Sequence, residues 1–161
     1  ALLTMVYRNG HNIRYHAIER WPLSEEVVAK LNYPVRISSK APVAKEYFRD
    51  LHNCPWNKSI QINNWFSILK QTIDLRSFED AGPYDVVYFD AFAPDKQPEL
   101  WTPEIFKKIA DAMNRGGILT TYSAKGSVKR ALTEAGMTVS KLPGPPGKRD
   151  IIRAIKKEPL H

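Results

Sequence analysis

Three acidic side chains stand at or just beyond the ends of short apolar segments: Glu19, Asp74 and Asp90. In open α/β sheets, ligands bind beyond the carboxyl ends of the strands, so these acids are expected at the binding edge. A nucleoside offers two ribose hydroxyls and an adenine amine, for which carboxylates are acceptors, and Glu19 suits the ribose and Asp74 the amine. Each acid taken alone is better explained by a loop cap or by solvation. Their shared position on successive strand ends favours a cofactor site.

Asp90 begins a segment whose composition suits amine chemistry. In residues 90–94 a carboxylate at the end of an apolar run leads into a turn with an aromatic ring and a proline, a combination found in many amino-group methyltransferases. Methyl transfer to a neutral nitrogen requires an oriented lone pair and a stabilised positive charge, and Asp90 is suited to provide both. Alternatively, Asp90 is a buried acid that accepts from turn amides, and Phe92 and Tyr122 are packing residues.

Two groups of basic residues are candidates for phosphate binding. Lys125, Lys129 and Arg130 fall on one predicted helix, while Lys148 and Arg149 lie in a turn rich in Pro and Gly. Such cations could hold the phosphates of a nucleic acid. A solvated face is the better explanation for the helical group, whereas the rigid turn presents Lys148 and Arg149 more favourably.

Short apolar runs alternate with amphipathic stretches along the chain. This alternation predicts a mostly parallel sheet covered by helices. Thr102 and Pro103 form a strong helix start, residues 114–117 are expected to end that helix, and Gly136 suits the end of a later one. The expected strands are 13–18, 65–70, 84–89, 118–122, 137–142 and 151–155, and the expected helices are 24–31, 42–51, 103–113 and 127–135.

The last two strands should pair as an antiparallel hairpin because they are joined through a Pro/Gly turn. An α/β sheet that is mostly parallel and ends in such a hairpin is characteristic of Rossmann-like methyltransferases. With 161 residues, of which 43% are apolar, the chain has the size of one domain. Residues 1–161 are therefore expected to form a single methyltransferase domain.

Composition limits the partners and cofactors. A net charge of +7 suits a polyanionic partner, although many globular proteins carry such a charge without binding nucleic acid. No apolar run approaches the ~20 residues that cross a bilayer, and the first residues lack the basic start of a secretion signal, so we expect a soluble, cytoplasmic protein. Cys54 is the only cysteine and the four histidines show no metal-ligand spacing, so we expect no disulfide and no metal.

Four longer segments carry a family resemblance. They are IERWPLS at 18–24, YFDAFAPDKQPELW at 88–101, TYSAKGSVKR at 121–130 and LPGPPGKR at 142–149. Together they resemble the methyltransferases that make 5-methylaminomethyluridine at the tRNA wobble position, found alone or fused to an oxidase in MnmC. The resemblance covers the whole chain, and the second segment is the most specific.

The resemblance implies N-methylation of the aminomethyl group of 5-aminomethyl-(2-thio)uridine in tRNA, with S-adenosylmethionine as the methyl donor. It implies no flavin, and together with the composition it implies no metal, no membrane and no obligate protein partner. The implied residues are Asp90 as the catalytic group, Glu19, Asp74 and Asp90 as cofactor contacts, and Phe92, Tyr122, Lys148 and Arg149 as substrate contacts.

The chain departs from the family pattern in two places. Ile73-Asp74 stands where the family usually has Gly-Asp, and the family's first strand and glycine-rich loop are absent. Residues 1–4 look like the helix that follows this loop. Because a start inside that helix would leave a buried sheet edge unpaired, we expect the sequence to be N-terminally incomplete.

Two alternative functions remain open. Besides tRNA methylation, the chain could be a non-catalytic RNA-binding module that has kept the fold, or a methyltransferase of this fold that acts on DNA, protein or a small amine. The missing glycines favour the first alternative. The retention of Glu19, Asp74 and Asp90 opposes it, since a decayed cofactor site has no need of three acids.

Overall fold

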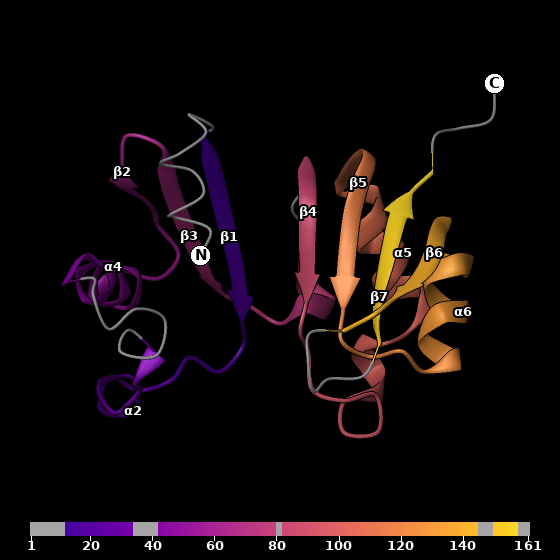
Figure 1. Cartoon of the computed structure of the whole chain (residues 1–161), viewed down its shortest axis with the longest axis horizontal. Helices are drawn as coiled ribbons and strands as arrows, with labels where there is room; N and C mark the ends of the chain where they lie inside the picture. The colour runs from indigo at the N-terminus through magenta and orange to yellow at the C-terminus, as the bar shows by residue number, and fades with distance from the viewer. Residues whose placement is uncertain (1–11, 34–41, 80–81, 145–149, 158–161) are drawn as a thin grey trace. The chain divides into compact units, whose positions relative to one another are not determined.

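The computed structural model describes residues 12–33, 42–79, 82–144 and 150–157 (Figure 1). They belong to two compact units, Ala1–Ser77 and Phe78–His161. That both form one domain stays a prediction. None of the helices in the described ranges combines the length and the apolar character needed to cross a membrane.

The first unit contains a three-stranded sheet in the order β1-β3-β2. β1 (Ile13–Glu19) runs parallel to β3 (Phe66–Thr72), and β2 (Ser59–Asn63) pairs with β3 in the antiparallel direction. Because β1 and β3 are parallel, their carboxyl ends lie at the same edge, where Glu19 is opposite Thr72. This register brings the predicted acids after the two strands to one edge of one sheet.

Helices and a small apolar core complete this unit. α2 (Glu25–Ala29) begins after Ser24, whose hydroxyl accepts from the backbone N–H of Val27 as predicted for a helix cap. α4 (Pro42–Asn53) and the 3-10 helix η1 (Leu75–Ser77) are the other helical segments. The core contains Cys54, Phe66 and Ile68, with Ile13, Leu51, Ile60 and Ile62 packed against it.

β2 is a strand that the sequence does not predict. Its pattern is only half-buried, with alternating exposed and intermediate residues and a register shift between Gln61 and Asn63, so that its apolar signal is short. The prediction for β3 began one residue too early and ended two residues too soon. The reason is that polar Gln71 and Thr72 extend the backbone pairing beyond the apolar run.

The second unit contains a four-stranded sheet in the order β4-β5-β7-β6 (Figure 1). β4 (Tyr84–Phe89) and β5 (Met113–Thr121) are parallel, while β7 (Ile151–Lys156) lies between β5 and β6 (Met137–Leu142) and is antiparallel to both. The predicted antiparallel hairpin at the end of the chain is therefore confirmed. The parallel β4–β5 pair places Phe89 opposite Thr121 at the carboxyl edge.

Two helices bury one stripe each in this unit. α5 (Pro103–Asp111) is capped by Thr102 as predicted, and it buries Phe106 completely. α6 (Gly126–Glu134) buries Val128, Ala131 and Leu132, and Gly136 follows it with a φ of +85°, the left-handed conformation that glycine adopts readily. α5 packs against α6, and α6 packs against β6.

The prediction that residues 112–117 complete and end a helix was wrong. α5 stops at Asp111, and β5 begins at Met113, which is only 3% exposed. Met113 has the spacing of a helical core residue, but its burial comes from the start of a strand. The pairing of β4 with β5 shifts register here, between Tyr84 and Val86, and Gly116 takes a positive φ of 72°.

Candidate active site

Glu19 lies at the carboxyl edge of the first unit. Its carbonyl oxygen accepts from the backbone N–H of Ile73 (3.2 Å), which ties the end of β1 to the segment after β3. Its carboxylate Oε1 accepts from the backbone N–H of Trp21 (2.8 Å). The second carboxylate oxygen has no hydrogen bond with any described residue, so that it can accept from a ligand hydroxyl.

Asp74 lies two residues beyond β3 and binds two arginines. Oδ1 accepts from the backbone N–H (2.9 Å) and Nε (3.0 Å) of Arg76, and Oδ2 accepts from Nη2 of Arg76 (2.7 Å). The Arg20 guanidinium is 2.9 Å from the same Oδ2. The Arg76 hydrogen bonds hold the pKa of the Asp74 carboxyl far below its usual range.

These contacts bear on the predicted role of Asp74. A carboxylate has about four lone-pair positions, and here the arginines take most of them. The loop-capping alternative considered for a single acid thus describes part of what Asp74 does. An adenine amine could reach this carboxylate only if it shared an oxygen with an arginine or displaced one. Arg20, whose side chain is 49% exposed, has a single contact with Asp74, and its guanidinium also lies over the Trp21 ring, 5.1 Å from the centroid.

Asp90 follows β4 directly in the second unit, and its side chain is exposed. None of the described residues donates a hydrogen bond to its carboxylate. The side chain is therefore not the buried turn cap considered as the alternative. Phe92, two residues further, is also exposed, at 76%.

Tyr122 follows β5 and meets the same loop. Its hydroxyl donates to the carbonyl oxygen of Ala91 (2.9 Å). Burial raises the pKa of the Tyr122 hydroxyl, and the negative charges of Asp90 and Asp95 raise it further. The phenol therefore stays protonated and remains a donor at neutral pH. The structure thus brings Asp90, Phe92 and Tyr122 together at the carboxyl edge of the β4–β5 pair.

Trp101 is a residue of this site that the sequence analysis did not single out. Its indole Nε1–H donates to the carbonyl oxygen of Phe92 (2.8 Å), and the ring is only 6% exposed. It packs edge-on against Phe89, with 5.0 Å between ring centroids, and against Tyr122, at 6.0 Å. A buried tryptophan usually requires an acceptor for its N–H, and this rule was the signal available in the sequence.

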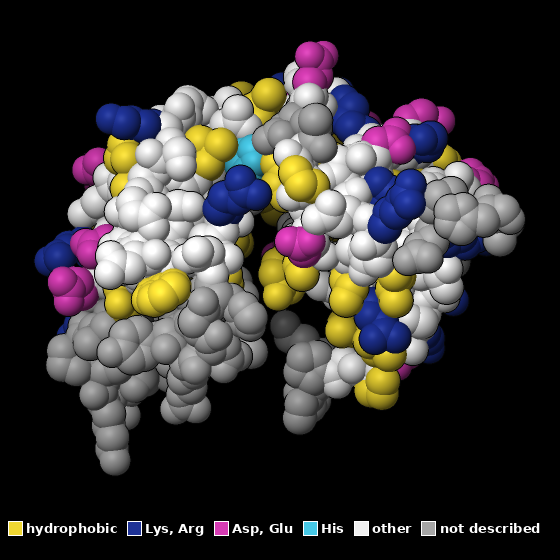
Figure 2. Space-filling model, turned by 90° about the horizontal axis from the view of Figure 1, so that it is seen from above, with side chains coloured by type: hydrophobic (Ala, Val, Ile, Leu, Met, Phe, Trp, Pro, Cys, Tyr) yellow, Lys and Arg dark blue, Asp and Glu magenta, His cyan; other side chains and the backbone are white. Residues whose placement is uncertain are grey.

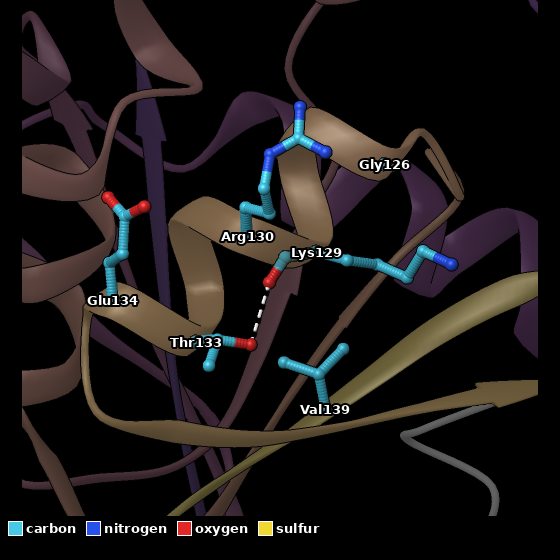
Figure 3. A pocket seen from close by; sticks show the side chains of 6 residues that line it. All are labelled: Gly126, Lys129, Arg130, Thr133, Glu134 and Val139. Carbon is cyan, nitrogen blue, oxygen red and sulfur yellow. Dashed lines mark hydrogen bonds between the residues drawn. The ribbon is translucent and has the colours of Figure 1, made fainter.

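The two predicted groups of basic residues have different outcomes. Lys148 and Arg149 lie outside the described residues. Lys125 precedes α6 and forms an ion pair with Asp95 in the loop after β4, so that it is not a free phosphate ligand. Lys129 and Arg130 lie on α6 and line a shallow groove with Gly126, Thr133, Glu134 and Val139 (Figure 3).

None of the residues that line this groove belongs to the loop that carries Asp90. Figure 3 shows the Lys129 and Arg130 side chains extending in different directions, and Glu134 adds a negative charge at the same surface. On the face shown in Figure 2, Lys and Arg side chains (dark blue) form separate groups among acidic ones (magenta). This distribution is typical of a solvated surface. Across the described residues, no three His, Cys, Asp or Glu side chains gather as a metal site would require.

The chain matches a known class of protein. A family model described as S-adenosyl-L-methionine-dependent methyltransferase matches residues 39–157. The chain belongs to this family.

Its relatives include the tRNA 5-methylaminomethyl-2-thiouridine biosynthesis bifunctional protein MnmC of Pseudoalteromonas atlantica, with 30% identity over 150 residues, 89% of this chain and 21% of the relative. The protein of the same name from Ralstonia nicotianae is 46% identical over 67 residues, 42% of this chain and 10% of the relative. The resemblance to MnmC predicted from the sequence is thereby confirmed. The chain spans about a fifth of the length of the first of these relatives.

Solved structures support the same fold. The crystal structure of MNMC2 from Aquifex aeolicus matches with a TM-score of 0.73 and 23% identity, and covers 99% of this chain and 49% of that one. A methyltransferase from Pyrococcus furiosus matches with a TM-score of 0.56 and 13% identity, and covers 98% of this chain and 69% of that one. The predicted Rossmann-like methyltransferase fold is confirmed, but the described sheets are mixed rather than mostly parallel, because β2, β6 and β7 pair in the antiparallel direction.

Proposed function

We propose that this chain carries the methyl-transfer site of an enzyme that N-methylates the aminomethyl group of 5-aminomethyl-(2-thio)uridine at the tRNA wobble position. The observation that carries the proposal is the exposed carboxylate of Asp90 at the end of β4, without a donor among the described residues. The names of the MnmC relatives supply the substrate class. The reaction needs no metal, flavin or obligate protein partner, and tRNA places it in the cytoplasm.

The donor set of the described residues fits a nucleoside cofactor. Glu19 has one unoccupied carboxylate oxygen for a ribose hydroxyl, and Asp74 can accept from the adenine amine when Arg20 moves away. S-adenosylmethionine, when bound, supplies an electrophilic methyl group on a sulfonium. Asp90 accepts an N–H of the incoming amine and stabilises the positive charge that forms on nitrogen.

The protonation state of the amine sets the pH dependence. A primary alkylamine has a pKa near that of lysine, about 10, so at neutral pH the site must bind or create the uncharged form. In this proposal the Phe92 ring borders the amine, and Lys148 and Arg149 contact tRNA phosphates. The rate of transfer is expected to fall as the pH is lowered below neutral.

The test is methyl transfer from labelled S-adenosylmethionine by the purified protein to three substrates: tRNA that carries the unmethylated aminomethyl group, DNA, and a small primary amine. Label in the wobble uridine alone supports the proposal. If DNA or the small amine is labelled instead, tRNA is not the substrate and the proposal is wrong. The proposal is also overturned if the protein binds the cofactor in calorimetry but labels none of the three substrates.

The matched pair of variants tests Asp90. Asp90→Asn keeps the shape and removes the charge, and we expect at least a 100-fold loss of kcat, as for other groups that act in the transition state. Asp111→Asn is the control, because Asp111 is an exposed acid at the end of α5, before β5 begins. Activity of the Asp90 variant near that of the control would contradict the assignment.

A further inference from the structure

The loop that follows β4 is held by its backbone rather than by its side chains. The carbonyl oxygens of two successive residues, Ala91 and Phe92, each accept a hydrogen bond from an aromatic side chain, Tyr122 at 2.9 Å and Trp101 at 2.8 Å. Two fixed carbonyls in a row define the orientation of both peptide planes. The side chains of Asp90 and Phe92, which flank Ala91, are exposed and form no hydrogen bond with the described residues.

We propose that Trp101 and Tyr122 are positioning residues that together aim the Asp90 carboxylate and the Phe92 ring at the substrate. This inference rests on the proposed function, and it differs from the role expected for Tyr122 from sequence, which was direct contact with substrate. The Tyr122 hydroxyl donates its hydrogen bond to the carbonyl oxygen of Ala91 in the loop. Trp101 acts entirely through other residues, because its ring is buried.

The packing around the two donors makes this arrangement rigid. Trp101 lies edge-on to Phe89, the last residue of β4, with an interplanar angle of 87°, and to Tyr122, with an angle of 85°. Phe106, fully buried on α5, contacts both Phe89 and Trp101. The packing of the core therefore fixes the position of the indole N–H. The hydrogen bond from this N–H in turn fixes the Phe92 carbonyl in the loop.

Each donor comes from a different part of the fold. Tyr122 follows β5, which is hydrogen-bonded to β4, and Trp101 directly precedes the cap of α5. The ion pair between Lys125 and Asp95 joins the same two loops at an exposed position. Because exposed ion pairs contribute little, the two aromatic donors are the main restraint on residues 90–92.

The test uses Tyr122→Phe and Trp101→Phe, which keep an aromatic ring and remove only the donor. We expect a loss of kcat of roughly 10-fold to 100-fold, since misplacement of a reacting group by about 1 Å is sufficient for such a loss. KM for tRNA and the affinity for S-adenosylmethionine should change by less than about threefold, since neither donor binds a ligand. Trp65→Phe is the control, because the Trp65 indole nitrogen has no hydrogen bond with a described residue.

Amide hydrogen exchange gives a second measurement that does not depend on activity. In both variants the amides of Lys96 and Gln97, which donate to the carbonyl oxygen of Ala93 in the same loop (2.7 and 3.0 Å), should exchange faster, while the amide of Leu119, which is fully buried in β5, should be unchanged. Wild-type kcat together with wild-type loop exchange in Tyr122→Phe would overturn the proposal, and so would a raised KM at unchanged kcat, which indicates direct substrate contact. If Trp101→Phe does not fold, Tyr122→Phe decides alone. If the wild-type protein methylates no substrate, the proposed function fails, and loop exchange still tests the positioning role.

Discussion

The two arginines around Asp74 lead to a prediction about stability. Replacement of Asp74 by Asn leaves one oxygen for the backbone N–H of Arg76 but removes the charge that attracts both guanidinium groups. The Arg20 and Arg76 side chains are each 49% exposed, so solvent screens both ion pairs. An exposed pair contributes about 0–1 kcal/mol, and two of them around one carboxylate should contribute about 1 kcal/mol in total. For a chain of this size that is a decrease in Tm of roughly 2–4 °C.

The sign of the pH dependence follows from the direction of the pKa shift. The pKa of Asp74 is lowered in the folded protein, first by the hydrogen bonds from Arg76, whereas in the unfolded chain it is about 3.9. The unfolded state therefore takes up the proton first as the pH falls. The stabilisation by Asp74 is fully present above about pH 5, and it is lost as the pH drops below about 4 towards the pKa of the folded state.

Urea unfolding of the wild type and of Asp74→Asn at pH 7, 5 and 3.5 measures this contribution. The difference in free energy of unfolding should be equal at pH 7 and 5, smaller at pH 3.5, and smaller in 1 M salt. Asp111→Asn, which breaks an exposed pair with Lys107 on one helix, should change stability by only a few tenths of a kcal/mol. Equal stability of the wild type and Asp74→Asn at pH 7, or a difference that does not shrink in acid, would refute the reasoning.

Two further predictions concern the core and the cofactor. Phe106→Ala should lower the free energy of unfolding by about 3–5 kcal/mol, because it leaves a cavity beside Phe89 and Trp101; chemical denaturation measures this loss, and a loss below about 1 kcal/mol would contradict the packing described. Glu19→Gln keeps an acceptor but removes the charge, and it should weaken S-adenosylmethionine binding by roughly 10-fold in calorimetry. Wild-type affinity of this variant would remove Glu19 from the proposed site.

The sequence was sufficient for the elements with strong local signals. The cap at Thr102, the glycine at Gly136 and the apolar run of β4 each specify their element within a few residues, and the structure has all three where they were expected. The positions of Glu19, Asp74 and Asp90 are likewise predicted by the apolar runs of the strands that precede them. Their roles as ligand contacts stay predictions.

The features that were missed depend on contacts distant in sequence. β2 is a half-buried strand whose pairing with β3 supplies what its own pattern lacks. Met113 has helical spacing but belongs to a strand, because its backbone pairs with Tyr84. The hydrogen bond from Trp101 to Phe92 spans a turn and a 3-10 helix, η2 (Pro98–Leu100), and no local rule specifies which carbonyl a buried indole will find.

Asp74 and Asp90 have the same position relative to a strand, but their electrostatic environments differ. Two arginines form ion pairs with Asp74, whereas no described side chain forms an ion pair with Asp90. An adenine amine is neutral, so it needs an acceptor oxygen, which a carboxylate already paired with cations can still supply. A methyl-transfer step breaks the bond between sulfur and the methyl carbon and moves the positive charge from the sulfonium to the attacking nitrogen, which a carboxylate without a paired cation can stabilise. The difference between these two acids is therefore the one that the proposed division of roles requires, with Asp74 at the base of the cofactor and Asp90 at the reacting amine.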